Sequence, residues 1–131
     1  MKHLLDTHVL LHWLAGTREL SRAHGRVIRN ASAERPLWIS DITLWEIATL
    51  FRLSRIRLDL PLRDWLESAA APPLVRRIGI SPAIAAEVAA LPDDFPRDPA
   101  DRIIVSTART LGATLLTQDE RIIEAKLVPT I

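Results

Sequence analysis

Four acidic residues, far apart along this chain, have the type and placement that divalent-cation chemistry requires: Asp6, Glu46, Asp101 and Asp119. Three of them follow or open short apolar segments typical of strands and helix starts, and Glu46 lies inside an apolar helix-forming stretch. If the fold gathers them, each like-charged pair at ~4 Å and an effective dielectric of ~20 costs about 4 kcal/mol. A divalent cation that prefers oxygen ligands is the usual compensation. The pattern therefore predicts a metal-dependent enzyme that acts on phosphate.

Glu46 is the most informative of the four acids because the stretch around it is apolar. It belongs to the helical stripe Ile42, Glu46, Leu50, with Trp45 and Ile47 beside it, so a helix here turns the carboxylate toward apolar surroundings. Burying an unpaired charge costs several kcal/mol. Either an ion pair with an arginine or a bound metal ion could compensate the charge of Glu46. We interpret Glu46 as part of a metal site.

The aspartates have a plainer alternative, since each could cap a following helix. Asp6 and Asp119 precede helix-forming stretches, and Asp98 is nearly an ideal cap with Pro99 at the first helical position. Asp101 would then favour the helix dipole from the first turn. Whether Asp98 is a metal ligand or only a helix cap stays open at this level.

Short apolar runs alternate with helix-forming stretches along the whole chain, which predicts an α/β fold with a parallel sheet covered on both faces. In such open sheets ligands collect at the carboxyl ends of the strands, where Asp6 and Asp119 are expected. Asp41 is expected to cap the helix that contains Glu46. We expect strands at 3–6, 37–40, 74–80 and 114–117, a last edge strand at 128–131, and helices at 7–14, 22–31, 42–53, 61–71, 82–91 and 99–111, with a short one after residue 119.

Size and composition indicate one globular domain. The chain has 131 residues, with 48% hydrophobic and 25% charged residues, enough to bury a core. Cysteine is absent, which excludes disulfides and thiolate zinc sites. Apart from Lys2 and Lys126 every basic side chain is arginine, whose fork suits phosphate, but a net charge of +1 does not by itself indicate nucleic acid. Without a signal-peptide pattern or an apolar run of membrane length, a cytoplasmic protein with no membrane partner is expected.

Four motifs resemble those of a known family. They are Leu4-Leu5-Asp6-Thr7-His8, Ser40-Asp41-Ile42-Thr43-Leu44-Trp45-Glu46-Ile47, Arg97-Asp98-Pro99-Ala100-Asp101-Arg102 and Leu115-Leu116-Thr117-Gln118-Asp119. In this order, and spread over essentially the whole chain, they are similar to the motifs of PIN-domain proteins, in particular the VapC-type toxins of bacterial toxin–antitoxin pairs. Any one of the motifs is weak, but all four in order are specific.

The resemblance implies a single PIN domain over residues 1–131, with a three-layer α/β/α fold around a mainly parallel sheet of four or five strands. It also implies an endoribonuclease that hydrolyses RNA phosphodiester bonds with Mg²⁺ or Mn²⁺, forms a homodimer and is neutralised by a cognate antitoxin protein. Carried over residue by residue, the catalytic and metal-binding acids are Asp6, Glu46, Asp101 and Asp119, bordered by the hydroxyls of Thr7 and Thr117. Basic residues near them are candidates to hold the RNA backbone: Arg52, Arg55, Arg57, Arg97 and Arg102.

Three other functions fit the residues less well. His8 and His12 have the spacing of a zinc peptidase, but no glutamate lies between them, so they are expected to be packing or rim residues. A catalytically inactive PIN-like module that only binds protein or RNA is disfavoured because all four acids are present. A receiver-like signalling domain would need a lysine beside the acids, whereas Lys126 comes after the short helix.

Overall fold

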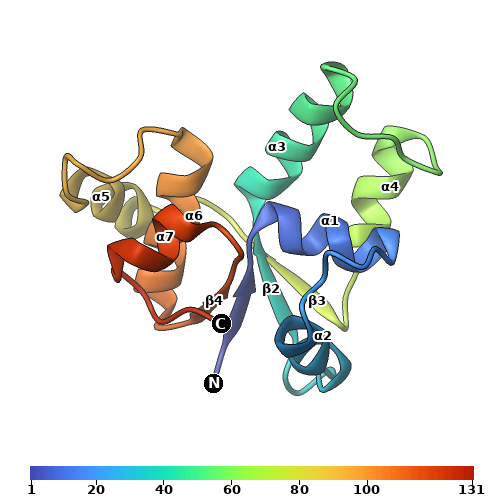
Figure 1. Ribbon diagram of the computed structural model, residues 1–131, viewed down its shortest axis with the longest axis horizontal. Helices are drawn as coiled ribbons and strands as arrows, with labels where there is room; N and C mark the ends of the chain where they lie inside the picture. Colours follow the sequence, from blue (N-terminus) through green and yellow to red (C-terminus); the bar gives the residue numbers. More distant parts are fainter.

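The computed structural model describes all 131 residues and is built around one parallel sheet of four strands. The strands lie in the order β3-β2-β1-β4, so the first strand of the chain is in the interior and the last is at an edge (Figure 1). All three pairings are parallel. The strands are β1 (His3–Leu5), β2 (Leu37–Ser40), β3 (Val75–Ile78) and β4 (Thr114–Leu116).

Seven helices connect and cover these strands: α1 (Thr7–Ala15), α2 (Arg22–Arg29), α3 (Asp41–Arg52), α4 (Leu62–Ala69), α5 (Pro82–Ala90), α6 (Pro99–Leu111) and α7 (Glu120–Ala125). Short polar side chains begin most of them, as the sequence predicts, because each accepts a hydrogen bond from a free backbone N–H in the first turn. These caps are Asp6, Ser21, Ser81, Asp98 and Asp119. None of the helices has both the length and the apolar character needed to cross a membrane.

The pleat of the strands divides the apolar side chains between two cores, one on each face of the sheet. Leu4 and Leu115 lie in a core with residues of α6 and α7, whereas Leu5 and Leu116 lie in a second core with residues of α1 and α3. Helices therefore cover both faces, which Figure 1 shows as two groups on either side of the sheet. The expected three-layer α/β/α architecture is confirmed.

The order of the strands creates a reversal between β1 and β4. From β1 the chain moves through β2 to β3 on one side, and then crosses to place β4 on the other side of β1. The register pairs Leu5 with Leu116, so the residues that follow these two strands emerge next to each other. Such a reversal leaves a crevice at the carboxyl ends of the strands, which is the usual ligand position in open α/β sheets.

Two local expectations from the sequence are wrong. Asp41 does not cap α3: the Ser40 hydroxyl accepts the hydrogen bond from Ile42 N at 3.2 Å, and the Asp41 carboxylate instead pairs with Arg77 Nε at 2.8 Å. The segment at 128–131 does not form a fifth strand. It exchanges hydrogen bonds with Leu115, but this produces only one isolated bridge beside β4.

Candidate active site

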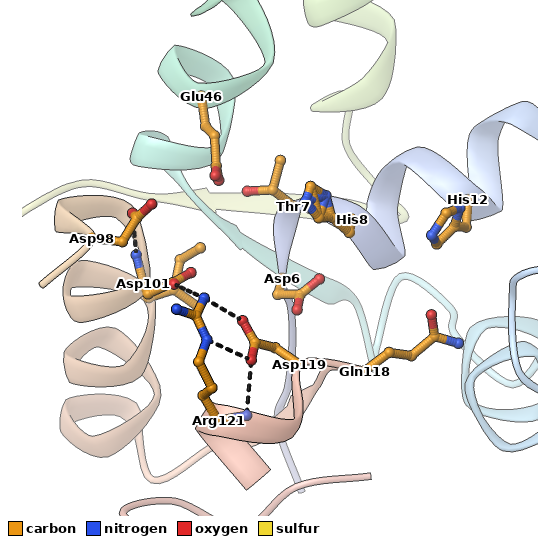
Figure 2. A pocket seen from close by; sticks show the side chains of 11 residues that line it. Asp6, Thr7, His8, His12, Glu46, Asp98, Asp101, Gln118, Asp119 and Arg121 are labelled. Carbon is orange, nitrogen blue, oxygen red and sulfur yellow. Dashed lines mark hydrogen bonds and ion pairs between the residues drawn. The ribbon is translucent and has the colours of Figure 1, made fainter. Parts of the chain in front are cut away.

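A polar pocket lies at the carboxyl ends of β1 and β4, and all four predicted acids line it (Figure 2). They reach it from four separate segments: the β1–α1 junction, α3, the start of α6 and the start of α7. Ile104 is the only hydrophobic residue in the lining, whose members are Asp6, Thr7, His8, His12, Glu46, Asp98, Asp101, Ile104, Gln118, Asp119 and Arg121. Residues 113 positions apart in the sequence therefore share one cavity.

Asp6 is the most buried of the acids and both of its carboxylate oxygens are engaged. The residue is 8% exposed, Oδ1 accepts a hydrogen bond from Val9 N at 2.9 Å, and Oδ2 accepts one from the Thr117 hydroxyl. Thr117 in turn accepts a hydrogen bond from Asp119 N at 3.1 Å. The cap and the threonine fix the carboxylate in one orientation, and the same threonine links it to the segment that carries the fourth acid.

Glu46 faces the pocket from α3 rather than an apolar core. It is half-buried, and no arginine lies within ion-pair distance of it. The sequence-based expectation of apolar surroundings is wrong, because the pocket lining is almost entirely polar. Burial raises the pKa of Glu46, the nearby charges of Asp98 and Asp6 raise it further, and the hydroxyl of Thr7 and the imidazole of His8 act in the opposite direction.

The helix that carries Glu46 is held against the first helix by a buried contact. The Thr7 hydroxyl at the start of α1 donates a hydrogen bond to the Thr43 hydroxyl at 3.0 Å, one turn before Glu46 on α3. Both threonines are almost completely buried. This bond ties α3 to the start of α1, directly after Asp6, and therefore helps to fix the position of Glu46 relative to Asp6.

Asp101 experiences the strongest electrostatic perturbation in the pocket. Its pKa is raised to about 6, first by burial and then by the charges of Asp98, Asp119 and Glu46, with Arg121 opposing the shift. The position of Asp101 is fixed by the start of α6, where Asp98 Oδ1 accepts hydrogen bonds from Ala100 N at 2.8 Å and Asp101 N at 3.2 Å. Asp98 is thus a helix cap that also lines the pocket.

Asp119 caps α7 and pairs with an arginine that the sequence analysis did not single out. Its Oδ1 accepts a hydrogen bond from Arg121 N at 2.9 Å, and Arg121 Nη2 lies 3.3 Å from Asp119 Oδ2. The same nitrogen lies 3.7 Å from Asp101 Oδ2. Figure 2 shows the guanidinium between these two carboxylates. In the sequence, the only signal for this pair is that Arg121 follows Asp119 by two positions at the start of a helix.

The chemistry of the donors fits a hard divalent cation, but the side chains are not arranged around one. Carboxylate oxygens are the preferred ligands of Mg²⁺ and Mn²⁺, and here they are in excess of the cationic groups of the pocket. Burial is the main cause of the raised pKa of Asp101 and of Glu46, and the charges of neighbouring carboxylates add to it. However, no three acidic or histidine side chains surround a common point in their present conformations. Asp101 and Asp119 instead face Arg121.

A more apolar groove adjoins the acidic pocket, and His8 and His12 line both. Leu50, Ile56 and Trp65 line this groove, together with Arg55 and Arg57. The groove lies between residues 8–19 on one side and residues 50–65 on the other. The two histidines are rim residues, as expected, and His12 Nδ1 lies 3.2 Å from the Thr17 hydroxyl.

Arg102 does not serve as the free basic residue that the sequence suggested. Its guanidinium donates hydrogen bonds to the carbonyl oxygens of Pro96 at 3.0 Å and Phe95 at 2.8 Å, and it lies over the Phe95 ring. These contacts hold the loop before α6. Arg102 is therefore a structural residue, whereas Arg52, Arg55, Arg57 and Arg97 are exposed.

Comparisons with known proteins identify the family of this three-layer fold. The PIN domain model matches residues 3–127, so this chain belongs to the PIN domain family. Among curated proteins, Ribonuclease VapC22 of Mycobacterium tuberculosis (strain ATCC 25618 / H37Rv) is 41% identical over 119 residues, covering 91% of this chain and 88% of that protein. The family assignment excludes the receiver-like alternative.

Solved structures support the same fold. VapBC2 from Rickettsia felis, bound to a DNA fragment from its promoter, aligns with a TM-score of 0.72 and 16% identity over 100% of this chain and 98% of that one. DNA-bound VapBC from Salmonella typhimurium aligns with a TM-score of 0.71 and 20% identity, covering 100% and 97% of the two chains. At these identities the likeness establishes the fold and nothing finer.

Proposed function

We propose that this protein is a ribonuclease of the VapC type, a metal-dependent endoribonuclease that acts as the toxin of a toxin–antitoxin pair. The observation that carries the proposal is the convergence of Asp6, Glu46, Asp101 and Asp119 in one pocket. The relative that is 41% identical over most of the chain is named a ribonuclease, which supports the same activity. An inactive PIN-like module would have no need to keep four mutually repelling acids in one cavity.

In this proposal the metal site is made by the four acids, with Asp6 and Asp101 as the central ligands. A bound Mg²⁺ or Mn²⁺ supplies Lewis-acid chemistry, which activates water and offsets charge on phosphoryl oxygens. Thr117 keeps the Asp6 carboxylate oriented toward the site through its hydrogen bond. Glu46, whose pKa is raised, is positioned by the Thr7–Thr43 contact at the side of the pocket opposite α7. No side chain serves as a covalent nucleophile.

The RNA backbone would lie on the exposed arginines near the pocket. Arg55 and Arg57 line the groove that adjoins it, and Arg52 and Arg97 are exposed at the ends of the elements that carry Glu46 and Asp98. Such contacts hold phosphates without reading sequence, so they fix where the strand lies and leave base preference to the shape of the groove.

The partners follow from the family and its relatives. Several similar folds were solved as toxin–antitoxin complexes, which supports a cognate antitoxin for this chain as well. We include in the proposal a homodimer, action in the cytoplasm where the RNA substrate occurs, and a single PIN domain over residues 1–131, since one sheet supports both cores.

The proposal is tested by replacing Asp6 with asparagine. Asp6→Asn keeps an oxygen for the Val9 N–H and a polar group for Thr117, so the fold is expected to persist. Cleavage of RNA in the presence of Mg²⁺ or Mn²⁺ is expected to fall by at least about 100-fold, and EDTA is expected to abolish the activity of the unchanged protein. Asp93→Asn, an exposed loop position outside the pocket, is the matched control and should cleave normally. Full cleavage by folded Asp6→Asn, or cleavage that survives EDTA, would refute the proposed mechanism.

A further inference from the structure

Arg121 is the only cationic side chain of guanidinium or ammonium type in the acidic pocket. One nitrogen, Nη2, lies within ion-pair distance of both Asp119 and Asp101, and Nε lies 3.5 Å from Asp119 Oδ1. The arginine therefore connects α6 to the start of α7 across the site (Figure 2). In effect it supplies the positive charge that the converging carboxylates require.

The position of Arg121 conflicts with simultaneous use of the same oxygens by a dication. Nη2 contacts the Oδ2 atoms of both Asp101 and Asp119, which the proposed function assigns to the metal. Placing a guanidinium and a dication on the same two oxygens would bring like charges together in a partly buried cavity.

The side chain of Arg121 is held weakly enough to move away from Asp101 and Asp119. Its side chain is 65% exposed, whereas those of Asp101 and Asp119 are 18% and 27% exposed. Ion pairs of an exposed arginine contribute little to stability, because solvent screens them and the long side chain loses freedom in forming them. The Asp119 carboxylate is fixed by its cap hydrogen bond with Arg121 N, and the backbone of Asp101 is held by the Asp98 cap, so the exposed arginine is the more mobile member of the cluster.

A second acidic position is within reach of the same side chain. Arg121 also lines a neighbouring surface pocket that contains Asp94 and Glu124. Glu124 is three residues further along α7, a spacing at which side chains of one helix face meet. A guanidinium that leaves the active-site acids therefore finds negative charge on the outer side of the same helix.

We propose that Arg121 is a built-in counter-ion of the metal-free site, which must release Asp101 and Asp119 and turn toward Asp94 and Glu124 when a divalent cation binds. The inference rests on the metal site of the proposed function. It makes Arg121 a competitor of the metal, so the affinity for the metal is lower than the acids alone would give. It also keeps the acids from repelling one another before the metal arrives.

The experiment measures Mn²⁺ binding to metal-free protein by isothermal titration calorimetry, comparing the unchanged chain with Arg121→Gln. Removing the competitor is expected to tighten Mn²⁺ binding by about three- to tenfold, and less at high salt, where the ion pairs are already screened. Arg63→Gln is the matched control: it removes the same charge from an exposed pair with Glu67 on α4, outside the pocket, and should leave the affinity unchanged. In addition, the NMR resonance of the Arg121 Nε–H should shift when diamagnetic Mg²⁺ is added, because the guanidinium then leaves the two aspartates.

The outcomes separate this inference from the function on which it rests. If the unchanged chain binds Mn²⁺ no better than Asp6→Asn, the proposed metal site itself is wrong. If the unchanged chain binds Mn²⁺ but Arg121→Gln binds it equally or more weakly, the counter-ion role is refuted and the metal site stands. An Arg121 resonance that does not respond to saturating Mg²⁺, or an equal gain in Arg63→Gln, also refutes it.

Discussion

Thr117 holds together the two halves of the acidic pocket, and replacing it with valine tests how much this contact contributes. The residue is 2% exposed, its hydroxyl donates to Asp6 Oδ2, and it accepts from Asp119 N. Valine has nearly the same shape, so Thr117→Val removes both hydrogen bonds without opening a cavity. It leaves a carboxylate oxygen and a backbone N–H without their partners in a region of low exposure.

The expected cost follows from these two bonds. A hydrogen bond to a charged group contributes about 1.5–3 kcal/mol, and one between neutral groups about 0.5–1.5 kcal/mol. Thr117→Val is therefore expected to lower the free energy of unfolding by about 2–4 kcal/mol. For a chain of this size that corresponds to a decrease in Tm of about 5–15 °C.

Urea and thermal denaturation of metal-free protein measure this effect, and two further variants control it. Thr107→Val removes another buried hydroxyl, whose bond goes to the Ile103 carbonyl within α6, and should cost about 1 kcal/mol or less. Thr117→Ser keeps the hydroxyl and should retain most of the stability. If Thr117→Val is no more destabilising than Thr107→Val, the argument that the threonine joins the two halves of the site is wrong.

Two further predictions concern the acids themselves. Because the pKa of Asp101 is raised from 3.8 to about 6 on folding, the folded state binds the proton more tightly than the unfolded state; this contribution to stability is fully present below about pH 4 and is lost as the pH rises through 6. After allowance for solvent screening, we expect the free energy of unfolding of metal-free protein to fall by about 1–2 kcal/mol over this pH range. Asp101→Asn should abolish this pH dependence. Parallel pH profiles of the two proteins in urea denaturation would contradict the prediction. Asp98→Ala should lower the free energy of unfolding by about 1 kcal/mol through loss of the α6 cap, whereas Asp98→Asn should keep the cap. If Asp98→Asn binds Mn²⁺ as the unchanged chain does, Asp98 is a cap only, whereas a weakened affinity would show that its charge contributes to the metal site.

Most of the fold could be predicted from the sequence because local signals act at its helix boundaries. The capping side chains Ser21, Ser81 and Asp98 satisfy backbone N–H groups that would be free in any tertiary setting, so their role does not depend on distant residues. Gly112 ends α6 with a φ of 64°, a left-handed conformation that glycine adopts without strain. The observed ends of these helices therefore lie within a few residues of the predicted ends.

The misplaced cap of α3 shows where local signals fail. Ser40 and Asp41 are both good caps, and the sequence does not say which one is used. The structure decides through Arg77, which lies 36 positions away and engages the Asp41 carboxylate. The prediction of a strand at 128–131 is wrong for a related reason. Whether an edge segment forms a strand depends on the length of its contact with β4 rather than on its own composition.

The convergence of the acids could be predicted, but their environment could not. Parallel strands bring Asp6 and Asp119 to one edge in any arrangement of this class, and the motifs supply Glu46 and Asp101. The polar surroundings of Glu46 and the pairing of Arg121 with Asp101 depend on how α3, α6 and α7 pack against one another. Such packing is set by side chains from the whole chain, and no spacing within one segment encodes it.

The hydrogen bond between Thr117 and Asp6 joins residues 111 positions apart, and β1 pairs with β4 over a similar separation. During synthesis on the ribosome, the first strand is made at once but its edge partner emerges only after more than a hundred further residues. At about 5–20 residues per second this delay is on the order of 5–20 s. Nascent chains that have not yet reached Asp119 lack both the fourth acid and the threonine that orients the first. A cell making this protein therefore meets no complete acidic site on partly synthesised copies, and any capacity to damage RNA begins only when translation of that region is over.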